Sequence, residues 1–230
     1  MIITIDGPAA SGKSTVAQLI AQKLDCYYLN SGLLYRALAY IIHDQGMQSE
    51  DYAQVSQGAL LDMLDPTCFS YCYTYGSVAI IYKQQDITTY LKSATIDHLA
   101  SALSSLKEVR AALLEYQRAF ARDHCLVTDG RDCGTVVFPQ ADYKFFLTAS
   151  VEVRAMRWQK EQAHKGIALS LQESKQSILT RDHRDMTRVL SPLMAAPDAY
   201  SIDNSYLTQE QTAAVLFEYI QSQQKAGEHI

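Results

Sequence analysis

A glycine-rich segment near the start of the chain has the residue types and spacing of a phosphate-binding loop. Residues 7–14 are Gly-Pro-Ala-Ala-Ser-Gly-Lys-Ser, which matches G-x-x-x-x-G-K-[ST], and the apolar run 1–5 precedes them. The glycines let the backbone turn its N–H groups towards phosphate oxygens, and a helix that starts at Lys13 adds the positive end of its dipole. The segment therefore predicts a nucleoside-triphosphate site.

Two side chains of this loop have chemistry of their own. Lys13 can reach the β- and γ-phosphates of a nucleotide, and the Ser14 hydroxyl is placed to ligate Mg²⁺. The residues expected to bind ATP are Gly7, Pro8, Ala9, Ala10, Ser11, Gly12, Lys13, Ser14 and Thr15.

A second polar turn follows the apolar run at residues 125–128. Asp129 ends this run, and its carboxylate can reach the shell of a bound Mg²⁺, although a turn-capping role is an alternative. Arg131 and Asp132 put a guanidinium beside a carboxylate, which suits an acceptor with both a phosphate and a hydrogen-bond donor. The alternative for this pair is an ordinary surface ion pair.

Arginines are concentrated between residues 154 and 188. We expect Arg181, Arg184 and Arg188 to share one helix face, with Arg154 and Arg157 on the preceding helix beyond a turn at residue 166. Mobile guanidiniums that close over a transferred phosphoryl group stabilise its charge. For any single arginine, a solvated helix face explains its presence equally well.

Hydrophobic periodicity places these motifs on an α/β framework. Strands and helices alternate along the chain, which predicts a parallel sheet wrapped by helices, whereas residues 47–92 contain a hairpin and form an insertion. The expected strands cover residues 2–5, 27–29, 71–75, 78–82, 125–128, 143–147 and 200–202. The expected helices cover residues 13–24, 33–43, 96–104, 107–122, 150–164, 171–184 and 210–221.

Composition limits the class of protein. The 230 residues carry a net charge of −5 and are 48% hydrophobic, which fits one domain with its own core and argues against coating nucleic acid or membranes. We expect the five cysteines (26, 68, 72, 125 and 133) to be free thiols in a reducing compartment. Without a signal peptide or a run of about 20 apolar residues, the sequence predicts a cytoplasmic protein.

Five segments together resemble the bacterial cytidylate kinases of the nucleoside monophosphate kinase family, over nearly the whole chain. They are residues 5–8 (Ile-Asp-Gly-Pro), 31–36 (Ser-Gly-x-x-Tyr-Arg), 109–110 (Val-Arg), 129–139 (Asp-Gly-Arg-Asp-Cys-Gly-Thr-Val-Val-Phe-Pro) and 181–188 (Arg-Asp-x-x-Asp-x-x-Arg). The fourth is the most specific, because other monophosphate kinases lack it.

The resemblance implies roles for residues that contact the acceptor nucleotide. Ser31, Arg36 and Arg131 would hold the acceptor, and the two arginines chiefly its phosphate. Asp185 would hold the ribose hydroxyls, and Arg157 would belong to a lid over the donor.

The same resemblance implies which residues read the base and which contact the transferred phosphate. Ser101, Arg110 and Asp132 would read the cytosine edge, and Arg181 and Arg188 would bridge the acceptor and the transferred phosphates. The catalytic set would then be Lys13, Asp129, Arg131, Arg157, Arg181 and Arg188.

The chain departs from the family pattern in a few places. Asn30 stands where the family often has Asp, and Cys133 where it usually has Met. Ser14 stands where many relatives have Gly, so Ser14 and Thr15 both remain candidates for the metal ligand beside Asp129.

The expected protein is a single P-loop kinase domain that uses ATP and Mg²⁺ to phosphorylate CMP and dCMP by direct in-line transfer. Its core would cover about 1–32, 123–153 and 190–230, with a monophosphate-binding insertion at about 33–122 and a lid at about 154–189. We expect a monomer without a nucleic-acid or membrane partner. The alternatives are a kinase for another monophosphate, such as UMP or AMP, and a non-catalytic ATP-binding regulator.

Overall fold

The computed structural model describes residues 1–47, 55–74 and 76–227, and the chain forms two compact units. Unit 1 contains Met1–Tyr28 and Cys125–Ile230, and unit 2 contains Leu29–His124. Tyr75, which the sequence pattern places at the end of a strand, lies outside the described residues.

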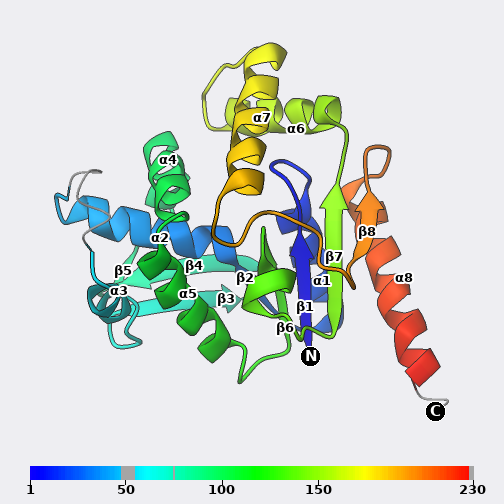
Figure 1. Cartoon of the computed structure of the whole chain (residues 1–230), viewed down its shortest axis with the longest axis horizontal. Coiled ribbons are helices and arrows are strands. Elements are labelled where there is room, and N and C mark those ends of the chain that lie inside the picture. Colours follow the sequence, from blue (N-terminus) through cyan, green and yellow to red (C-terminus); the bar gives the residue numbers. More distant parts are fainter. Residues whose placement is uncertain (48–54, 75, 228–230) are drawn as a thin grey trace. The chain divides into compact units, whose positions relative to one another are not determined.

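A five-stranded sheet forms the centre of unit 1 (Figure 1). Its strands are in the order β2 (Tyr27–Asn30), β6 (Leu126–Gly130), β1 (Ile2–Asp6), β7 (Tyr143–Thr148) and β8 (Tyr200–Asp203). Strand β1 pairs in parallel with β6 and β7, and β7 pairs in parallel with β8. The predicted α/β fold with a parallel sheet is therefore confirmed.

Four long helices accompany this sheet. Helix α1 (Lys13–Leu24) follows β1 and packs against the last helix, α8 (Gln209–Gly227). Helices α6 (Val151–His164) and α7 (Leu171–Thr187) pack against each other beyond the end of β7, as Figure 1 shows. The turn between them contains Gly166 at φ 78°, a left-handed conformation that favours glycine.

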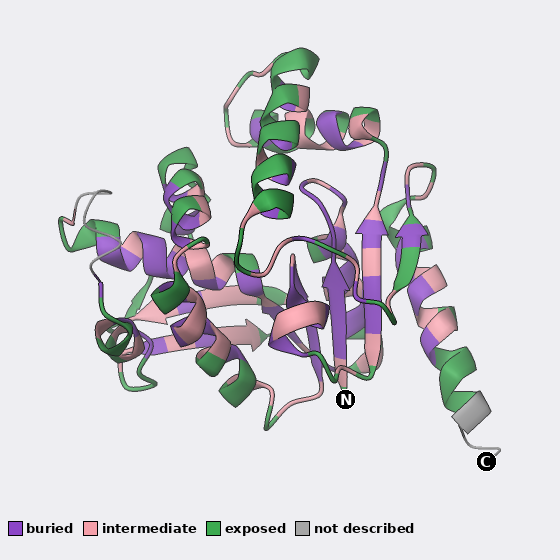
Figure 2. Ribbon diagram, in the orientation of Figure 1, coloured by how far each residue is buried: buried purple, intermediate pink, exposed green. Residues whose placement is uncertain are grey.

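Burial explains why the central strands are continuous apolar runs. Strands β1 and β6 have neighbours on both sides, and Ile3, Ile5 and Val127 are fully buried (Figure 2). Polar residues appear where these strands end, because a buried parallel sheet exposes only its ends to ligands. The parallel pairing of β1 and β6 thus brings Asp6 and Asp129, near the ends of these strands, to the same edge.

Unit 2 contains the predicted hairpin and helices. Strands β3 (Phe69–Thr74) and β4 (Ser77–Tyr82) pair antiparallel, and a short β5 (Gln85–Asp86) extends them. The Tyr71 ring packs edge-on against Phe120, as expected for a tyrosine that serves strand packing. The helices are α2 (Ser31–Asp44), α3 (Gln57–Met63), η2 (Tyr90–Lys92), α4 (Ala94–Leu103) and α5 (Lys107–Phe120).

Short elements and some boundaries differ from the sequence expectation. Helix α3, strand β5, turn η2 and a one-turn π-helix, η3 (Cys133–Val137), were not predicted, because two to seven residues carry too little periodicity. Helix α2 begins two residues earlier than expected, since the Asn30 side chain accepts the Leu33 N–H and caps it.

The expectation of five free thiols is wrong for one pair. Cys26 and Cys125 form a disulfide across 99 residues of sequence, while Cys68, Cys72 and Cys133 are not disulfide-bonded. The Tyr27 N–H donates to the Cys125 carbonyl at 2.7 Å, which brings the two Cα atoms to 4.9 Å. The bond joins the points where the chain leaves unit 1 and returns to it. Of the helices described, none has the length and apolar character needed to span a membrane.

Candidate active site

The phosphate loop between β1 and α1 requires glycine at its first position. A Cβ on Gly7 would lie 2.0 Å from the Leu147 carbonyl oxygen, so no larger residue fits beside β7. Gly12 caps α1 with φ 88°, and Ala10 also has a positive φ of 57°. This backbone leaves the loop wrapped around the start of α1, as the motif predicts.

Lys13 is buried inside this loop. Its Nζ donates to the Pro8 carbonyl at 2.8 Å, and the residue is only 5% exposed. Burial and the nearby Arg131 guanidinium lower the pKa of Lys13 to about 7, against a smaller opposing effect of Asp129. A bound phosphate would supply the missing negative charge, so the loop is built for an anionic ligand.

Asp129 at the end of β6 lies beside the loop. The Ser14 hydroxyl donates to its Oδ2 at 2.7 Å and the Tyr28 hydroxyl to its Oδ1 at 2.6 Å. A hydroxyl and a carboxylate in contact are the hard oxygen donors that Mg²⁺ prefers, so both residues fit this ion. In the described residues no group of three His, Cys, Asp or Glu side chains could hold a metal, so other ligands would come from phosphates or water.

The Arg131–Asp132 turn is paired with α7 and the residue that follows it. Arg131 Nε donates to Asp185 Oδ2 at 2.8 Å, and Arg188 Nη2 to Asp132 Oδ1 at 3.3 Å. Burial alone would raise the pKa of Asp185, but the Arg131 guanidinium holds it below its usual range. All four side chains are at most 17% exposed, so the alternative of a surface ion pair within the turn is wrong.

Asp6 at the end of β1 fixes the same turn through its backbone. Its two carboxylate oxygens accept the N–H groups of Cys133 at 2.9 Å and Gly134 at 2.7 Å. Burial outweighs these hydrogen bonds and raises the pKa of Asp6 to about 6. A Cβ on Gly134 would lie 2.8 Å from Thr4 Oγ1, so glycine is needed for this close approach. No role for Asp6 was predicted from the sequence.

Two arginines of α6 contact the backbone of the phosphate loop. Arg157 Nη1 donates to the Ser11 carbonyl at 3.3 Å and to Asn204 Oδ1 at 3.0 Å. Arg154 Nη1 donates to the Ala9 carbonyl at 3.1 Å. Asn204 Nδ2 also donates to the Ser11 carbonyl, at 2.9 Å. Sequence spacing gave no sign of Asn204, which lies 193 residues from Ser11.

The arginines of α7 do not all share one helix face, contrary to the expectation from their spacing. Helix α7 ends at Thr187, and Arg188 follows in an extended conformation with φ −62° and ψ 141°. Arg181 is half-buried and close enough to influence the pKa of Lys13 and Asp185, whereas Arg184 is exposed. Arg188 is instead oriented by its hydrogen bond to the Ser191 carbonyl at 2.7 Å.

The remaining predicted acceptor residues belong to unit 2. Ser31 is buried at the first position of α2, and Arg36 one turn later pairs with Asp97 of α4 at 2.6 Å. Arg110 of α5 donates to the Ser104 carbonyl at 3.2 Å. Its guanidinium also lies 6.0 Å from the Tyr35 ring centre. Ser101 is half-exposed on α4.

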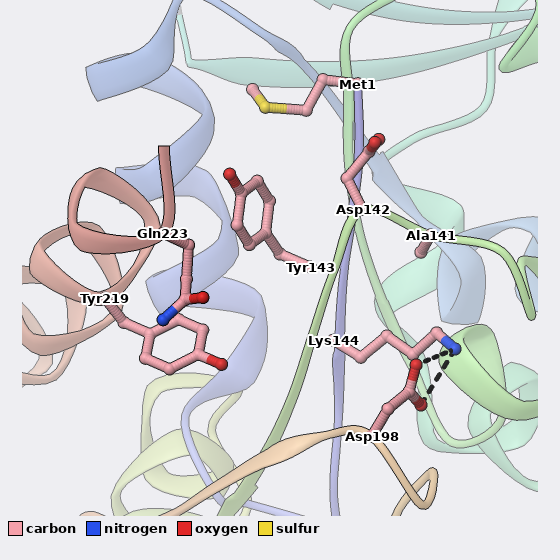
Figure 3. Close-up of a pocket in the computed structure, with 8 residues that line it drawn as sticks. All are labelled: Met1, Ala141, Asp142, Tyr143, Lys144, Asp198, Tyr219 and Gln223. Carbon is pink, nitrogen blue, oxygen red and sulfur yellow. Dashed lines mark hydrogen bonds and ion pairs between the residues drawn. The ribbon is translucent and has the colours of Figure 1, made fainter. Parts of the chain in front are cut away.

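A cavity of about 480 Å³ lies at the opposite edge of the sheet, where the strands begin (Figure 3). Figure 3 shows Lys144 and Asp198 facing each other on one side of β7, with Tyr143, Tyr219 and Gln223 on the other. None of the predicted site residues lines it. The candidate active site is therefore the edge where the strands end.

Comparisons with known proteins agree with this geometry. A family model described as "Cytidylate kinase" matches residues 3–222. A cytidylate kinase of Marinomonas sp. (strain MWYL1) is 43% identical over 216 residues, 94% of this chain and 93% of that protein. A cytidylate kinase of Methylococcus capsulatus is 41% identical over 223 residues, 96% of this chain and 97% of that protein.

One solved structure shares the fold at low sequence identity. An uncharacterised protein from Eubacterium ventriosum superposes with a TM-score of 0.54 and is 12% identical. The match covers 96% of this chain and 98% of that one.

Proposed function

We propose how the residues described above act in catalysis. The chain belongs to the cytidylate kinase family and phosphorylates CMP and dCMP, with ATP as the phosphoryl donor. The acceptor phosphate attacks the γ-phosphorus of ATP directly and in line, which yields ADP and CDP or dCDP. A covalent enzyme intermediate is unnecessary, because the acceptor phosphate is itself the nucleophile. The protein contributes positioning and charge neutralisation.

The donor phosphates bind at the loop of residues 7–15. Lys13 gives up its hydrogen bond to the Pro8 carbonyl and turns its ammonium to the β- and γ-phosphates. Ser14 and Asp129 would hold Mg²⁺, which when bound neutralises charge on the phosphate oxygens. The 2.7 Å contact between their oxygens favours Ser14 over Thr15 as the hydroxyl ligand.

The acceptor phosphate and the transferred phosphate bind to the guanidiniums of Arg131, Arg181 and Arg188. Asp185 holds the ribose hydroxyls, and Asp132 accepts a hydrogen bond from the cytosine amino group. The observation that best supports these roles is the buried pairing of Arg131 with Asp185 and of Arg188 with Asp132. Such pairs keep guanidiniums charged, oriented and ready for an anion in a site with little water.

Four residues of unit 2 complete the acceptor set. Arg36 binds the acceptor phosphate beside Ser31, while Ser101 and Arg110 contact the base. The 2.6 Å contact with Asp97 holds the Arg36 guanidinium in one orientation before substrate arrives.

The proposal extends to the domain roles, the oligomeric state and the location. We assign the core to about 1–32, 123–153 and 190–230, the monophosphate-binding insertion to about 33–122 and the lid to about 154–189. Arg157, which is anchored at Ser11, belongs to this lid. The enzyme works as a cytoplasmic monomer without nucleic acid or membrane.

Substitution of Arg188 by Met tests these assignments, with Arg184→Met as the matched control. Arg184 lies four residues away, is exposed, and has no assigned role. We expect R188M to lower kcat/KM for CMP by about 100-fold or more and R184M by less than about twofold. Equal effects in the two variants would contradict the acceptor roles. Initial rates with CMP, dCMP, UMP and AMP then measure the preference, and a preference for AMP would contradict the base-reading set.

A further inference from the structure

The backbone of Ala9, in the phosphate loop, is held at both its N–H and its carbonyl by two side chains of the α6–α7 pair. The Ala9 N–H donates to Asp182 Oδ1 at 2.8 Å, and its carbonyl accepts from Arg154 Nη1 at 3.1 Å. Arg154 Nη1 also donates to Asp182 Oδ2. Ala9, Arg154 and Asp182 are 2%, 6% and 4% exposed, so water does not compete for these contacts.

Arg154 is itself fixed to the sheet. Its Nε donates at 3.0 Å to the carbonyl of Ala149, directly after β7. The Asp182–Arg154 pair therefore links three parts of the catalytic edge: the end of β7, the phosphate loop and α7. It does so over a sequence separation of 173 residues between Ala9 and Asp182.

The buried pair is not needed simply to bring α6 and α7 together. Ala9, Ala155 and Ile178 form a buried apolar cluster with Val151 and Trp158 packed against it, and apolar burial supplies adhesion without orientation. A buried ion pair contributes little net stability compared with apolar residues of the same volume, because both charges lose their water. Its particular effect is to fix direction and distance.

The position of Asp182 on α7 decides what is fixed. Arg181 is its neighbour in sequence. Asp185, the partner of Arg131, lies three residues further on, almost one helical turn. Any displacement of the Ala9 peptide by a bound donor is thus transmitted through one hydrogen bond to the helix that carries the acceptor-side charges. The Ala9 N–H is directed at Asp182.

We propose that Asp182 is a positioning residue that couples donor binding at the phosphate loop to the placement of Arg181 and Asp185 on α7. The proposal rests on the acceptor roles given above. It predicts that ATP and CMP bind with positive coupling, and that this coupling depends on Asp182 holding both the Ala9 N–H and the Arg154 guanidinium. By linkage the same factor appears whichever ligand is added first.

The test combines Asp182→Asn with a binding cycle. An amide oxygen can still accept from Ala9, but its NH₂ group then faces the Arg154 guanidinium, so the variant cannot keep both contacts. Dissociation constants of a non-hydrolysable ATP analogue are measured by calorimetry with and without CMP, together with kcat and both KM values. We expect the wild-type coupling factor, of about tenfold, to fall to near one. We expect kcat to fall by about 10- to 100-fold and each KM, measured with the other substrate saturating, to rise by up to about tenfold, while the dissociation constant of each ligand alone changes by less than about threefold.

Two control variants separate positioning from structure. Ile178→Val removes one methylene from the apolar cluster one turn before Asp182 and is expected to lower Tm by about 3 °C while coupling and kcat stay unchanged. Glu152→Gln breaks the exposed α6–α7 ion pair with Lys175, which does not touch the loop, and should change none of these values. The double variant R154Q/D182N leaves no unpaired buried charge, and we expect it to lack coupling even if D182N folds poorly.

Three outcomes would overturn the proposal. They are a wild-type protein without coupling, a folded D182N or R154Q/D182N protein with unchanged coupling and kcat, and an I178V protein that loses coupling to the same extent. Failure of the acceptor roles is recognised separately, because it would appear as full activity in R188M whatever D182N does.

Discussion

The two edges of the parallel sheet hold their charged side chains in different ways. Where the strands end, buried charges pair with residues far along the chain and with the backbone of the phosphate loop, as in Arg131–Asp185 and Arg154–Asp182. Where the strands begin, Lys144 is buried but its partner Asp198 is exposed, and the pair borders a cavity. The Cys26–Cys125 disulfide also precedes β2 and β6 at this edge.

On the proposed roles, this difference separates charges that would bind substrate from charges that support the fold. At the edge where the strands end, Lys13 is buried with its pKa lowered to about 7, a costly arrangement that a phosphate would relieve. At the other edge, the buried Lys144 ammonium is already neutralised by Asp198 and also donates to the carbonyl of Pro139. For these two lysines, the one without a carboxylate partner at hydrogen-bond distance among the described residues is the candidate for binding an anionic ligand, and the one paired with Asp198 is a structural contact.

The two buried lysines give the largest expected contrast. Lys13→Met removes the cation that we propose for the transferred phosphate, and we expect kcat to fall about 10³-fold, or about 4 kcal/mol in the activation free energy. Lys144→Met removes an equally buried cation at the opposite edge, and we expect a change in kcat of less than about twofold with a lower Tm. Steady-state kinetics with CMP and ATP measure both. Comparable losses of kcat would remove the distinction between the two edges.

The disulfide provides the next contrast, because its effect should be on stability alone. Replacing Cys26 and Cys125 by Ala removes the covalent link between residues 99 positions apart, so the unfolded chain gains conformational entropy. We expect a loss of about 3 kcal/mol in the free energy of unfolding. Urea unfolding measures this value, and the reduced wild-type protein should show a similar loss. At 25 °C kcat and both KM values should stay the same, so an altered KM for CMP would show that this edge also affects the site.

Two carboxylates, one at each edge, should respond to pH in opposite directions. Burial raises the pKa of Asp6 from 3.8 to about 6, so between these values the folded chain keeps a proton that the unfolded chain has lost. Its contribution to stability is full below about pH 4 and is lost as the pH rises through 6, by roughly 2 to 3 kcal/mol in all. The hydrogen bond from Lys144 lowers the pKa of Asp198, so its contribution is lost instead as the pH falls.

Urea unfolding between about pH 2.5 and 7 tests both directions, because the contribution of Asp6 changes above about pH 4 and that of Asp198 changes below its ordinary pKa of 3.8. The difference in the free energy of unfolding between the wild type and D6N isolates the contribution of Asp6, because the contributions of all other titrating groups cancel. The difference between the wild type and D198N isolates that of Asp198 in the same way. We expect the first difference to fall with rising pH and the second to rise. A first difference that rises would mean that the Cys133 and Gly134 N–H groups outweigh burial at Asp6.

Much of the framework was predictable from sequence, because it depends on local patterns. The loop motif requires a strand before it and a helix after it, and β1 and α1 lie where the pattern indicates. The hairpin was visible from alternation around Gly76. The carboxylates Asp6 and Asp182 were not predictable, since each binds backbone N–H groups more than 120 residues away, and no local spacing encodes such a contact. The Cys26–Cys125 disulfide was not predicted for the same reason, because its two residues are 99 positions apart.

The smallest expected effect concerns specificity at the edge where the strands end. Asp132 is 7% exposed and accepts from Arg188, so Asp132→Asn keeps its size but replaces an acceptor oxygen by an NH₂ group. If this carboxylate reads the cytosine amino group, kcat/KM for CMP should fall by about tenfold, or about 1.4 kcal/mol, while KM for ATP stays constant. UMP, which presents a carbonyl at that position, should lose less or gain. Parallel assays with CMP and UMP measure the ratio of their kcat/KM values, and the control Asp142→Asn, at the other edge, should leave this ratio unchanged. Equal losses for both nucleotides would mean that Asp132 supports Arg188 and does not read the base.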